Sequence, residues 1–336
     1  MILHTTPTAY IISHPDSVKY TVPQTDNNDQ VVNQNYYQLT RTLFEIHKPF
    51  INNTHTNLDA LAVKLESVYK SEIVPYFDKR IVDNAAAIDN SIAVKTAQEL
   101  FSQMDSVYEK FHGANATGSV VVTKFKDKVY LFPPNCRFFN CDLFVEDGVF
   151  LGVEKFDLVV MDPPWKNKFI KRRKGNCMGY DTHSTESIEK LRLGSILKPD
   201  AIVAIWSTNS KTEKILGDMM KKWGLVHLTT FYWLKVTTSG RVTVPFTKKD
   251  GKQPFESLII ATNNSEIKSH INYPMRIIVS TPSAINSHKP PLTDVLEDYF
   301  QREFTSKCEL FARYLLPDYT SIGNQVLKLN NLLLFQ

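Results

Sequence analysis

The hydrophobic positions of this chain change their period near residue 118. Between residues 34 and 117, apolar residues recur every three or four positions, which is the spacing of one face of an α-helix. The clearest series are Leu58, Leu61, Leu65, Val68 and Tyr69, and then Ala97, Leu100, Phe101, Met104, Tyr108 and Phe111. We therefore predict a helical N-terminal domain over residues 34–117. Residues 1–33 are polar, and the Asn-, Asp- and Gln-rich stretch 24–34 predicts that part of them is disordered.

From residue 118 to the end, short apolar runs alternate with helical patterns, and the Gly- and Asn-containing cluster 112–118 marks the change. The strand candidates are Ser119–Phe125, Phe156–Met161, Ala201–Thr208, Leu228–Val236, Ser257–Thr262, Arg276–Ser280 and Glu309–Ala312. The helix candidates are Thr185–Leu193, Lys211–Trp223 and Leu292–Arg302. Such alternation favours a mostly parallel sheet with helices on both faces. We predict an α/β domain over residues 118–336.

Composition limits the class of protein. The chain has 336 residues, 43% of them hydrophobic, so it can bury a sizeable core. Its apolar runs are far shorter than the roughly 20 residues of a membrane-spanning helix, and its first 15 residues lack the pattern of a secretion signal. Four cysteines without paired spacing argue against disulfides and zinc. We expect an intracellular protein with free thiols and no metal; the net charge of +4 is only weak evidence for a polyanionic partner.

The strand Phe156–Met161 runs directly into Asp162-Pro163-Pro164-Trp165. Ligands of open α/β sheets bind beyond the carboxyl ends of strands, which is where this tetrapeptide falls. Asp162 and the Pro163 carbonyl can accept hydrogen bonds from an adenine N6 amine and so localise its lone pair. The two prolines stiffen the turn and are expected to leave carbonyls that no local amide uses. Trp165 offers a face on which a base can stack.

These features predict that residues 162–165 clamp an adenine base. A Pro-Pro turn whose tryptophan packs on the core is the alternative interpretation.

The tetrapeptide at a strand end resembles the catalytic motif of the MT-A family of adenosine N6-methyltransferases, and the likeness covers residues 118–330. Five further segments follow the order of that family: 140–143, 233–235, 287–290, 309–313 and 323–325. Within it the chain is most similar to the methyltransferase-like four branch, judged from residues 166–172, 235–240 and 289–292. The resemblance implies a Rossmann-like methyltransferase sheet. That branch is associated with N6-methylation of an internal 2′-O-methyladenosine in U2 small nuclear RNA, and DNA has also been proposed as its substrate.

The resemblance also implies S-adenosylmethionine as methyl donor, although the chain has no glycine-rich nucleotide loop. It places Asp142 and Leu143 beside the donor adenine, and Asn324, Gln325 and Arg313 near its ribose. Asp162, Glu309 and Lys289 complete the implied set, with Lys289 on the methionine carboxylate.

Simpler interpretations of these residues stay open. Glu309 and Arg313 could form an ordinary ion pair four residues apart, and Gly323-Asn324 is a common turn dipeptide. The family carries a histidine where this chain has Leu315, which puts one ribose contact in doubt.

The segment after the motif places six basic residues in nine, which predicts contacts to phosphates. A solvated face or a nuclear import signal is the alternative. Gly175 and Gly179 suit a mobile lid. The predicted substrate-binding residues are Trp165, Lys166, Asn167, Lys171, Arg172, Arg173, Lys174, Tyr180, Lys235, Glu256 and His288. His288 could instead only stiffen a turn.

We therefore predict a nuclear, and also cytoplasmic, enzyme that methylates N6 of adenosine in RNA, in particular small nuclear RNA, and that acts without a protein partner. The alternatives are a DNA adenine N6-methyltransferase and a noncatalytic RNA-binding subunit of the same fold. The catalytic residues are predicted to be Asp162, Pro163, Pro164 and Trp165.

Overall fold

The computed structural model describes residues 1–25, 31–50, 58–78, 90–104, 109–144, 154–165, 185–207, 210–247, 252–264, 266 and 273–336. These residues are organised around one 11-stranded sheet. Across the sheet the strands are β1 (Ile2–Thr5), β2 (Ala9–Ile12), β13 (Arg276–Ser280), β11 (Val226–Lys235), β12 (Phe255–Thr262), β10 (Leu197–Ser207), β9 (Phe156–Met161), β14 (Lys307–Leu310), β15 (Tyr319–Gly323), β8 (Cys136–Asn140) and β5 (Phe111–Asn115). Five of these strands, from β10 to β8, run parallel to one another.

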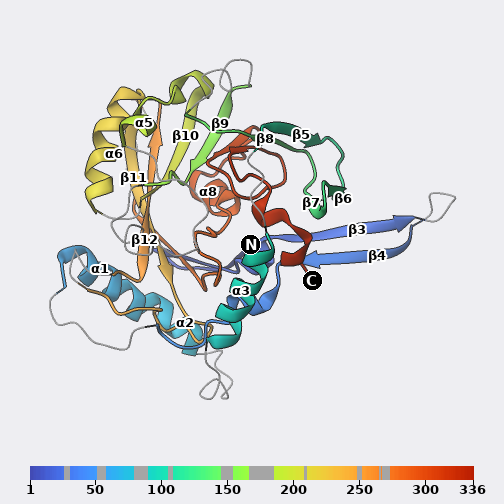
Figure 1. Ribbon diagram of the computed structural model, residues 1–336. Helices are drawn as coiled ribbons and strands as arrows, with labels where there is room; N and C mark the ends of the chain where they lie inside the picture. Colours follow the sequence, from blue (N-terminus) through green and yellow to red (C-terminus); the bar gives the residue numbers. More distant parts are fainter. Residues whose placement is uncertain are drawn as a thin grey trace.

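Helices cover both faces of the sheet, as the alternating pattern predicts (Figure 1). On one face α5 (Thr185–Glu189) and α6 (Ser210–Lys222) pack over the central strands. Helix α6 buries Leu216, Met219 and Met220, and it ends at Gly224, whose left-handed φ of 70° permits the two backbone bonds of a Schellman cap. On the other face α8 (Thr293–Phe300) buries Val295 and Leu296. The Rossmann-like α/β class is therefore supported, and all seven strand candidates and three helix candidates correspond to observed elements.

The N-terminal region differs from the prediction of a helical domain. It contains helices α1 (Ala60–Val68), α2 (Val74–Asp78) and α3 (Ser91–Gln103), with a π-helical turn at Tyr69–Ile73 between the first two, but it begins with strands. Strand β2 is buried along its whole length because it pairs in parallel with β13, so the N-terminus forms one edge of the large sheet. Strands β3 (Lys19–Thr25) and β4 (Val31–Gln38) form a hairpin that extends away from the body (Figure 1).

The C-terminal residues pair with the end of β4. The backbones of Gln38 and Gln336 exchange two hydrogen bonds of 3.0 and 2.9 Å, and Leu39 bridges Phe335. The remaining elements are the hairpin β6 (Val121–Phe125) and β7 (Lys128–Phe132), with short 3₁₀ turns at Pro15–Ser17, Arg41–Phe44, Leu193–Ile196, Lys328–Asn330 and Leu332–Leu334. The N-terminal segment is thus part of the large sheet and its core and not a separate layer.

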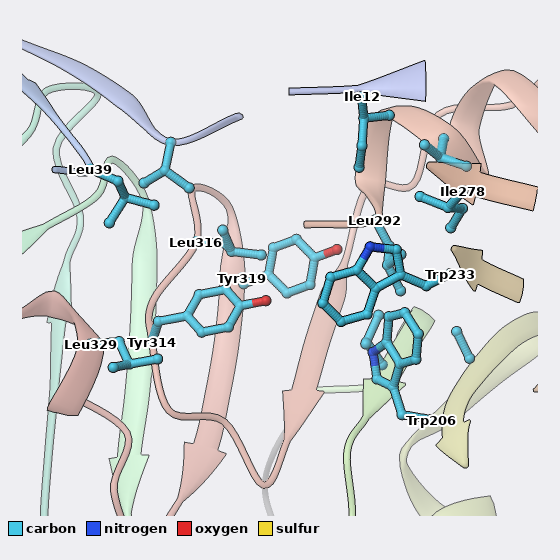
Figure 2. Close-up of a cluster of buried hydrophobic side chains, with 14 of the residues drawn as sticks. Ile12, Leu39, Trp206, Trp233, Ile278, Leu292, Tyr314, Leu316, Tyr319 and Leu329 are labelled. Atoms are coloured by element: carbon cyan, nitrogen blue, oxygen red, sulfur yellow. The ribbon is translucent and has the colours of Figure 1, made fainter. Parts of the chain in front are cut away.

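The largest buried cluster lies on the α8 face of the sheet. Figure 2 shows its centre, where Tyr314 and Tyr319 lie between leucine side chains and the indoles of Trp206 and Trp233. The two indoles meet edge to face with ring centroids 5.8 Å apart. No helix in the described part of the chain is long and apolar enough to span a membrane.

Candidate active site

Four parallel strands bring distant parts of the sequence to one edge of the sheet. In the register of the sheet, Met161 lies opposite Leu310, Leu310 opposite Ile322, and Gly323 opposite Asn140. The residues that follow these strand ends are therefore neighbours, although they come from four separate segments. This arrangement places Asp162 in the same region as Asp142, Glu309 and Asn324, as the sequence analysis expected.

Asp162 belongs to a network of side chains that alternate in charge. The ammonium of Lys289 lies 2.9 Å from Oδ2 of Asp162 and 3.1 Å from Oε2 of Glu256. Glu256 also pairs with Lys235. Asp162 follows β9, Lys289 precedes α8, Glu256 lies on β12 and Lys235 ends β11. Four separate elements thus hold this network in place.

The network shifts the pKa values of Glu256 and Lys289. Burial by itself would raise the pKa of Glu256, but the positive charges of Lys235 and Lys289 outweigh it and hold that pKa at about 2. Burial likewise opposes the charged form of Lys289, yet the neighbouring carboxylates of Asp162 and Glu256 raise its pKa. Each ammonium also faces an indole: Lys289 lies 5.4 Å from the ring centre of Trp206, and Lys235 lies 4.5 Å from that of Trp233. Lys289 is therefore a fixed cation.

Glu309 is buried next to this network. Burial and, after it, the negative charge of Asp162 raise the pKa of Glu309 to about 8, while Lys289 acts in the opposite direction. Glu309 thus carries a proton at neutral pH. It lies in strand β14, and Phe311 with a left-handed φ of 61° turns the chain just beyond that strand, so the helical spacing of an ordinary Glu309–Arg313 ion pair does not apply. Arg313 instead donates to the Asn286 carbonyl at 3.3 Å.

The turn after Asp162 differs in two respects from the prediction. The carbonyl of Pro163 accepts a hydrogen bond from the Trp165 amide at 2.7 Å, so a local amide does use it, because the turn closes on itself. One lone pair of that oxygen is left for another donor. The indole of Trp165 is buried in the core cluster on the α6 face, and its Nε1 donates to the Trp206 carbonyl at 2.9 Å. Trp165 therefore packs on the core, as the alternative interpretation has it, while Pro164 is half-buried.

The predicted donor-site residues at the other strand ends are held by local contacts. Oδ1 of Asp142 accepts from the Phe144 amide at 2.9 Å and so fixes the turn that also contains buried Leu143. Asn324 is exposed and Gln325 is buried. A Cβ atom at Gly323 would lie 2.5 Å from the Ala312 carbonyl oxygen, so only glycine allows the ends of β14 and β15 to approach this closely.

Two further features of this edge were missed by sequence reasoning. Buried Asn140 donates to the Glu109 carbonyl at 2.7 Å, and its Oδ1 accepts from the Val326 amide at 3.4 Å, so it ties the end of β8 to the turn after β15. Phe144 and Phe311 form a half-buried pair with ring centroids 5.6 Å apart. Both phenylalanines adjoin segments that carry the family resemblance, and this was the available signal.

The remaining predicted substrate residues divide into two groups. Lys235 and Glu256 belong to the charge network, whereas His288 is buried on the far side of its loop, against His14, Phe44 and Tyr314. Burial, and then the charge of Arg313, lowers the pKa of His288 to about 3. The following residues lie outside the described part of the chain: Lys166, Asn167, Lys171, Arg172, Arg173, Lys174 and Tyr180.

Comparison with known proteins agrees with this geometry. The sequence profile described as MT-A70 matches residues 156–325, about half of the chain. The chain belongs to the MT-A70 family. The matched region contains Asp162, Glu256, Lys289, Glu309 and Asn324, so the whole charge network lies within the part that the MT-A70 family shares.

Individual relatives narrow the placement within the MT-A70 family. The N(6)-adenine-specific methyltransferase METTL4 of Mus musculus is 31% identical over 230 residues, which cover 65% of this chain and 47% of that protein. A protein named DNA N6-methyl methyltransferase from Caenorhabditis elegans is 37% identical over 169 residues, covering 50% and 45%. The N6-methyladenosine RNA methyltransferase MTA1 of Cryphonectria parasitica is 32% identical over 179 residues, covering 52% of each. The chain spans about half the length of these curated relatives and falls in the METTL4 branch.

Proposed function

We propose that this chain transfers a methyl group from S-adenosylmethionine to N6 of an adenine in RNA, with an internal 2′-O-methyladenosine, as in U2 small nuclear RNA, as its target. The observation that carries the proposal is the placement of Asp162. Its carboxylate stands half-buried at the carboxyl end of β9, with one oxygen bound to Lys289. The other oxygen is not held by that ion pair and is available to an amine hydrogen.

Residues at the same edge fit the chemical groups of the methyl donor. The amides of Asn324 and Gln325 can bond ribose hydroxyls, and the Asp142 turn can meet a purine. An ammonium has three N–H donors, and two of those on Lys289 are directed to Asp162 and Glu256. The third remains for a carboxylate. When bound, S-adenosylmethionine supplies an electrophilic methyl group on a positively charged sulfur.

The protein's own part in the reaction is to hold the amine. Asp162 accepts one hydrogen of N6, and the Pro163 carbonyl, through its second lone pair, accepts the other. Both acceptors are fixed before the substrate arrives, Asp162 by Lys289 and Pro163 by the turn to Trp165. Such prior alignment contributes to the rate because the reacting atoms need no further ordering. Glu309 carries a proton at neutral pH and can act as a neutral hydrogen-bond donor beside them.

DNA is the second candidate substrate, and the relative that is 37% identical carries a DNA methyltransferase name. The two candidates share the same chemistry and differ at the ribose 2′ position. A noncatalytic RNA-binding subunit is less well supported, because Asp162 stands in the network that would serve catalysis.

One experiment separates these candidates. The purified chain is incubated with S-adenosylmethionine and three oligonucleotides of one sequence: RNA, RNA with a single 2′-O-methyladenosine, and DNA. Nucleoside mass spectrometry should show N6,2′-O-dimethyladenosine as the main product. The control oligonucleotide carries purine, which lacks the N6 amine, at the target position and should gain no methyl group. Methylation of the DNA alone would transfer the assignment to the second candidate, and no methylated base in any of the three would overturn the proposal.

A further inference from the structure

The loop that carries Lys289 contacts the N-terminal segment. This loop, residues 281–292, joins β13 to α8. The Leu43 carbonyl accepts a hydrogen bond from the Ala284 amide at 2.7 Å. Further along the loop, Ser287 has a left-handed φ of 59°, which turns His288 and Lys289 away from the preceding backbone direction. The loop that carries Lys289 is therefore tied to the N-terminal segment by the bond between Ala284 and Leu43.

His14, also in the N-terminal segment, packs directly against this loop. Its imidazole meets that of His288 edge to face with ring centroids 4.6 Å apart, and it meets Phe44 at 4.9 Å. His14 is 1% exposed, and among the described residues neither of its ring nitrogens has a hydrogen-bond partner. Ring contacts thus position the His14 side chain, and one of them is with His288, the residue immediately before Lys289.

We propose that His14 is a positioning residue for Lys289: its ring packs on His288 and thereby keeps the Lys289 ammonium between Asp162 and Glu256. Two backbone carbonyls of the loop near Lys289 accept hydrogen bonds from side chains. Tyr314 Oη donates to the Lys289 carbonyl at a long 3.4 Å, and Arg313 donates to the Asn286 carbonyl at 3.3 Å. Long hydrogen bonds of this kind orient a loop weakly. The buried ring contact between His14 and His288 adds a restraint on the residue next to Lys289.

This inference reaches beyond the family match, which begins at residue 156. It makes the N-terminal segment part of the active site. Its importance for methyl transfer rests on the proposed function, but the placement of Lys289 can be measured without any methyl transfer.

The test is a pulse of amine acetylation with an N-hydroxysuccinimide ester, followed by peptide mass spectrometry. Three lysines are equally protected, with exposures of 6% for Lys289, 9% for Lys307 and 7% for Lys328, so the last two are internal controls. His14→Leu keeps apolar volume but removes the ring, and His14→Phe restores a ring. We expect His14→Leu to raise the labelling rate of Lys289 about tenfold through local opening, with Lys307 and Lys328 unchanged and with His14→Phe close to wild type.

Ile12→Ala is the matched control, because Ile12 is buried in the same segment and packs in the cluster of β2 and β13. It should lower overall stability without selective labelling of Lys289. An unchanged Lys289 rate in His14→Leu, an equal rise at all three lysines, or a failure of His14→Phe to restore protection would each overturn the inference. If the wild-type chain methylates no oligonucleotide, the proposed function fails while the labelling result still decides the role of His14.

Discussion

The ammonium of Lys289 lies 2.9 Å from Oδ2 of Asp162 and, at the same time, 3.1 Å from Glu256. Asp162 directly follows β9 and Glu256 lies on β12, and these two strands are separated in the sheet by β10. One lysine thus joins strands that do not pair, at the point where the family motif leaves the sheet. A buried pair of this kind contributes little net stability, but breaking it leaves an uncompensated charge. We therefore infer that the network serves to position the Asp162 carboxylate.

The first prediction concerns pH and Glu309. Its pKa of about 8 in the folded protein exceeds its ordinary value of 4.5, so the folded state binds the extra proton between these two values. This contribution to stability is fully present below pH 4.5 and is lost as the pH rises through about 8. Denaturant unfolding should show that the wild type loses stability relative to Glu309→Gln as the pH rises over this window, while the lowered pKa values of His14 and His288 affect both proteins alike. A tenfold difference in proton affinity corresponds to about 1.4 kcal/mol.

The control for this measurement is Glu303→Gln, which alters an exposed carboxyl just before the same strand and should leave the profile unchanged. Glu256 does not interfere, because its pKa is lowered to about 2 and its contribution is lost only as the pH falls below 4.5. If the unfolding free energies of the wild type and Glu309→Gln ran parallel between about pH 5 and about pH 8, the assignment of a protonated Glu309 would be contradicted.

The second prediction concerns Trp165. Replacement by phenylalanine removes the bond from Nε1 to the Trp206 carbonyl and should cost about 1–3 kcal/mol of unfolding free energy. Trp223→Phe is the control, because its indole is equally buried and donates to the Glu189 carbonyl at 3.1 Å. Both variants should lose similar stability, but only Trp165→Phe should also slow methyl transfer, by about tenfold, because the turn that holds Asp162 is loosened. Equal methyl-transfer rates in the two variants would show that Trp165 has no role beyond packing.

The third prediction concerns the basic residues after the motif, for which the sequence alone provides the argument. Neutralising Lys171, Arg172, Arg173 and Lys174 together should weaken RNA binding. Each lost phosphate contact should flatten the slope of log affinity against log salt by roughly 0.7 to 0.9, and donor affinity should not change. The control neutralises three exposed lysines of α6, Lys214, Lys221 and Lys222, and so removes three charges where the test variant removes four. A nuclear import signal makes the opposite forecast, namely altered cellular location with an unaltered slope.

The sequence predicted the central part of the fold well, for a physical reason. Strands β9 and β13 were predicted to the residue because each contains an unbroken apolar run, Leu158–Met161 and Ile277–Val279, that is followed by polar residues. Strand β2 was missed because it has only four residues, and its partner β13 lies more than 260 residues away in the sequence. Strand β15 was missed because Thr320 and Ser321 are polar although they are buried. A local pattern cannot report a pairing that depends on a distant strand.

In the candidate site, too, the sequence predicted single residues but not the contacts between residues that are distant in the chain. The resemblance identified Asp162 and Lys289 separately, but their direct contact depends on where the loop before α8 crosses the sheet. Glu256 was singled out only as a substrate residue, because nothing near it in the sequence indicates that Lys289 lies beside it. The orientation of Trp165 was equally open, since a tryptophan after a strand can face either the core or the solvent.

The proposed function requires that Asp162 act on the transferred amine and not on the fold. Asp157→Asn is the matched control, because Asp157 is the second residue of β9, the strand that leads into Asp162, and accepts hydrogen bonds from the Thr305 and Ser306 amides at 3.1 Å. That variant should lose stability but, while folded, keep its turnover.

The decisive measurement is the rate of methyl transfer to the 2′-O-methyladenosine oligonucleotide by Asp162→Asn, with donor affinity measured by calorimetry on the same sample. We predict donor affinity close to that of the wild type and turnover below about one tenth of it, a loss of more than about 1.4 kcal/mol of transition-state stabilisation. Turnover above that level in a folded, donor-binding Asp162→Asn protein would contradict the claim.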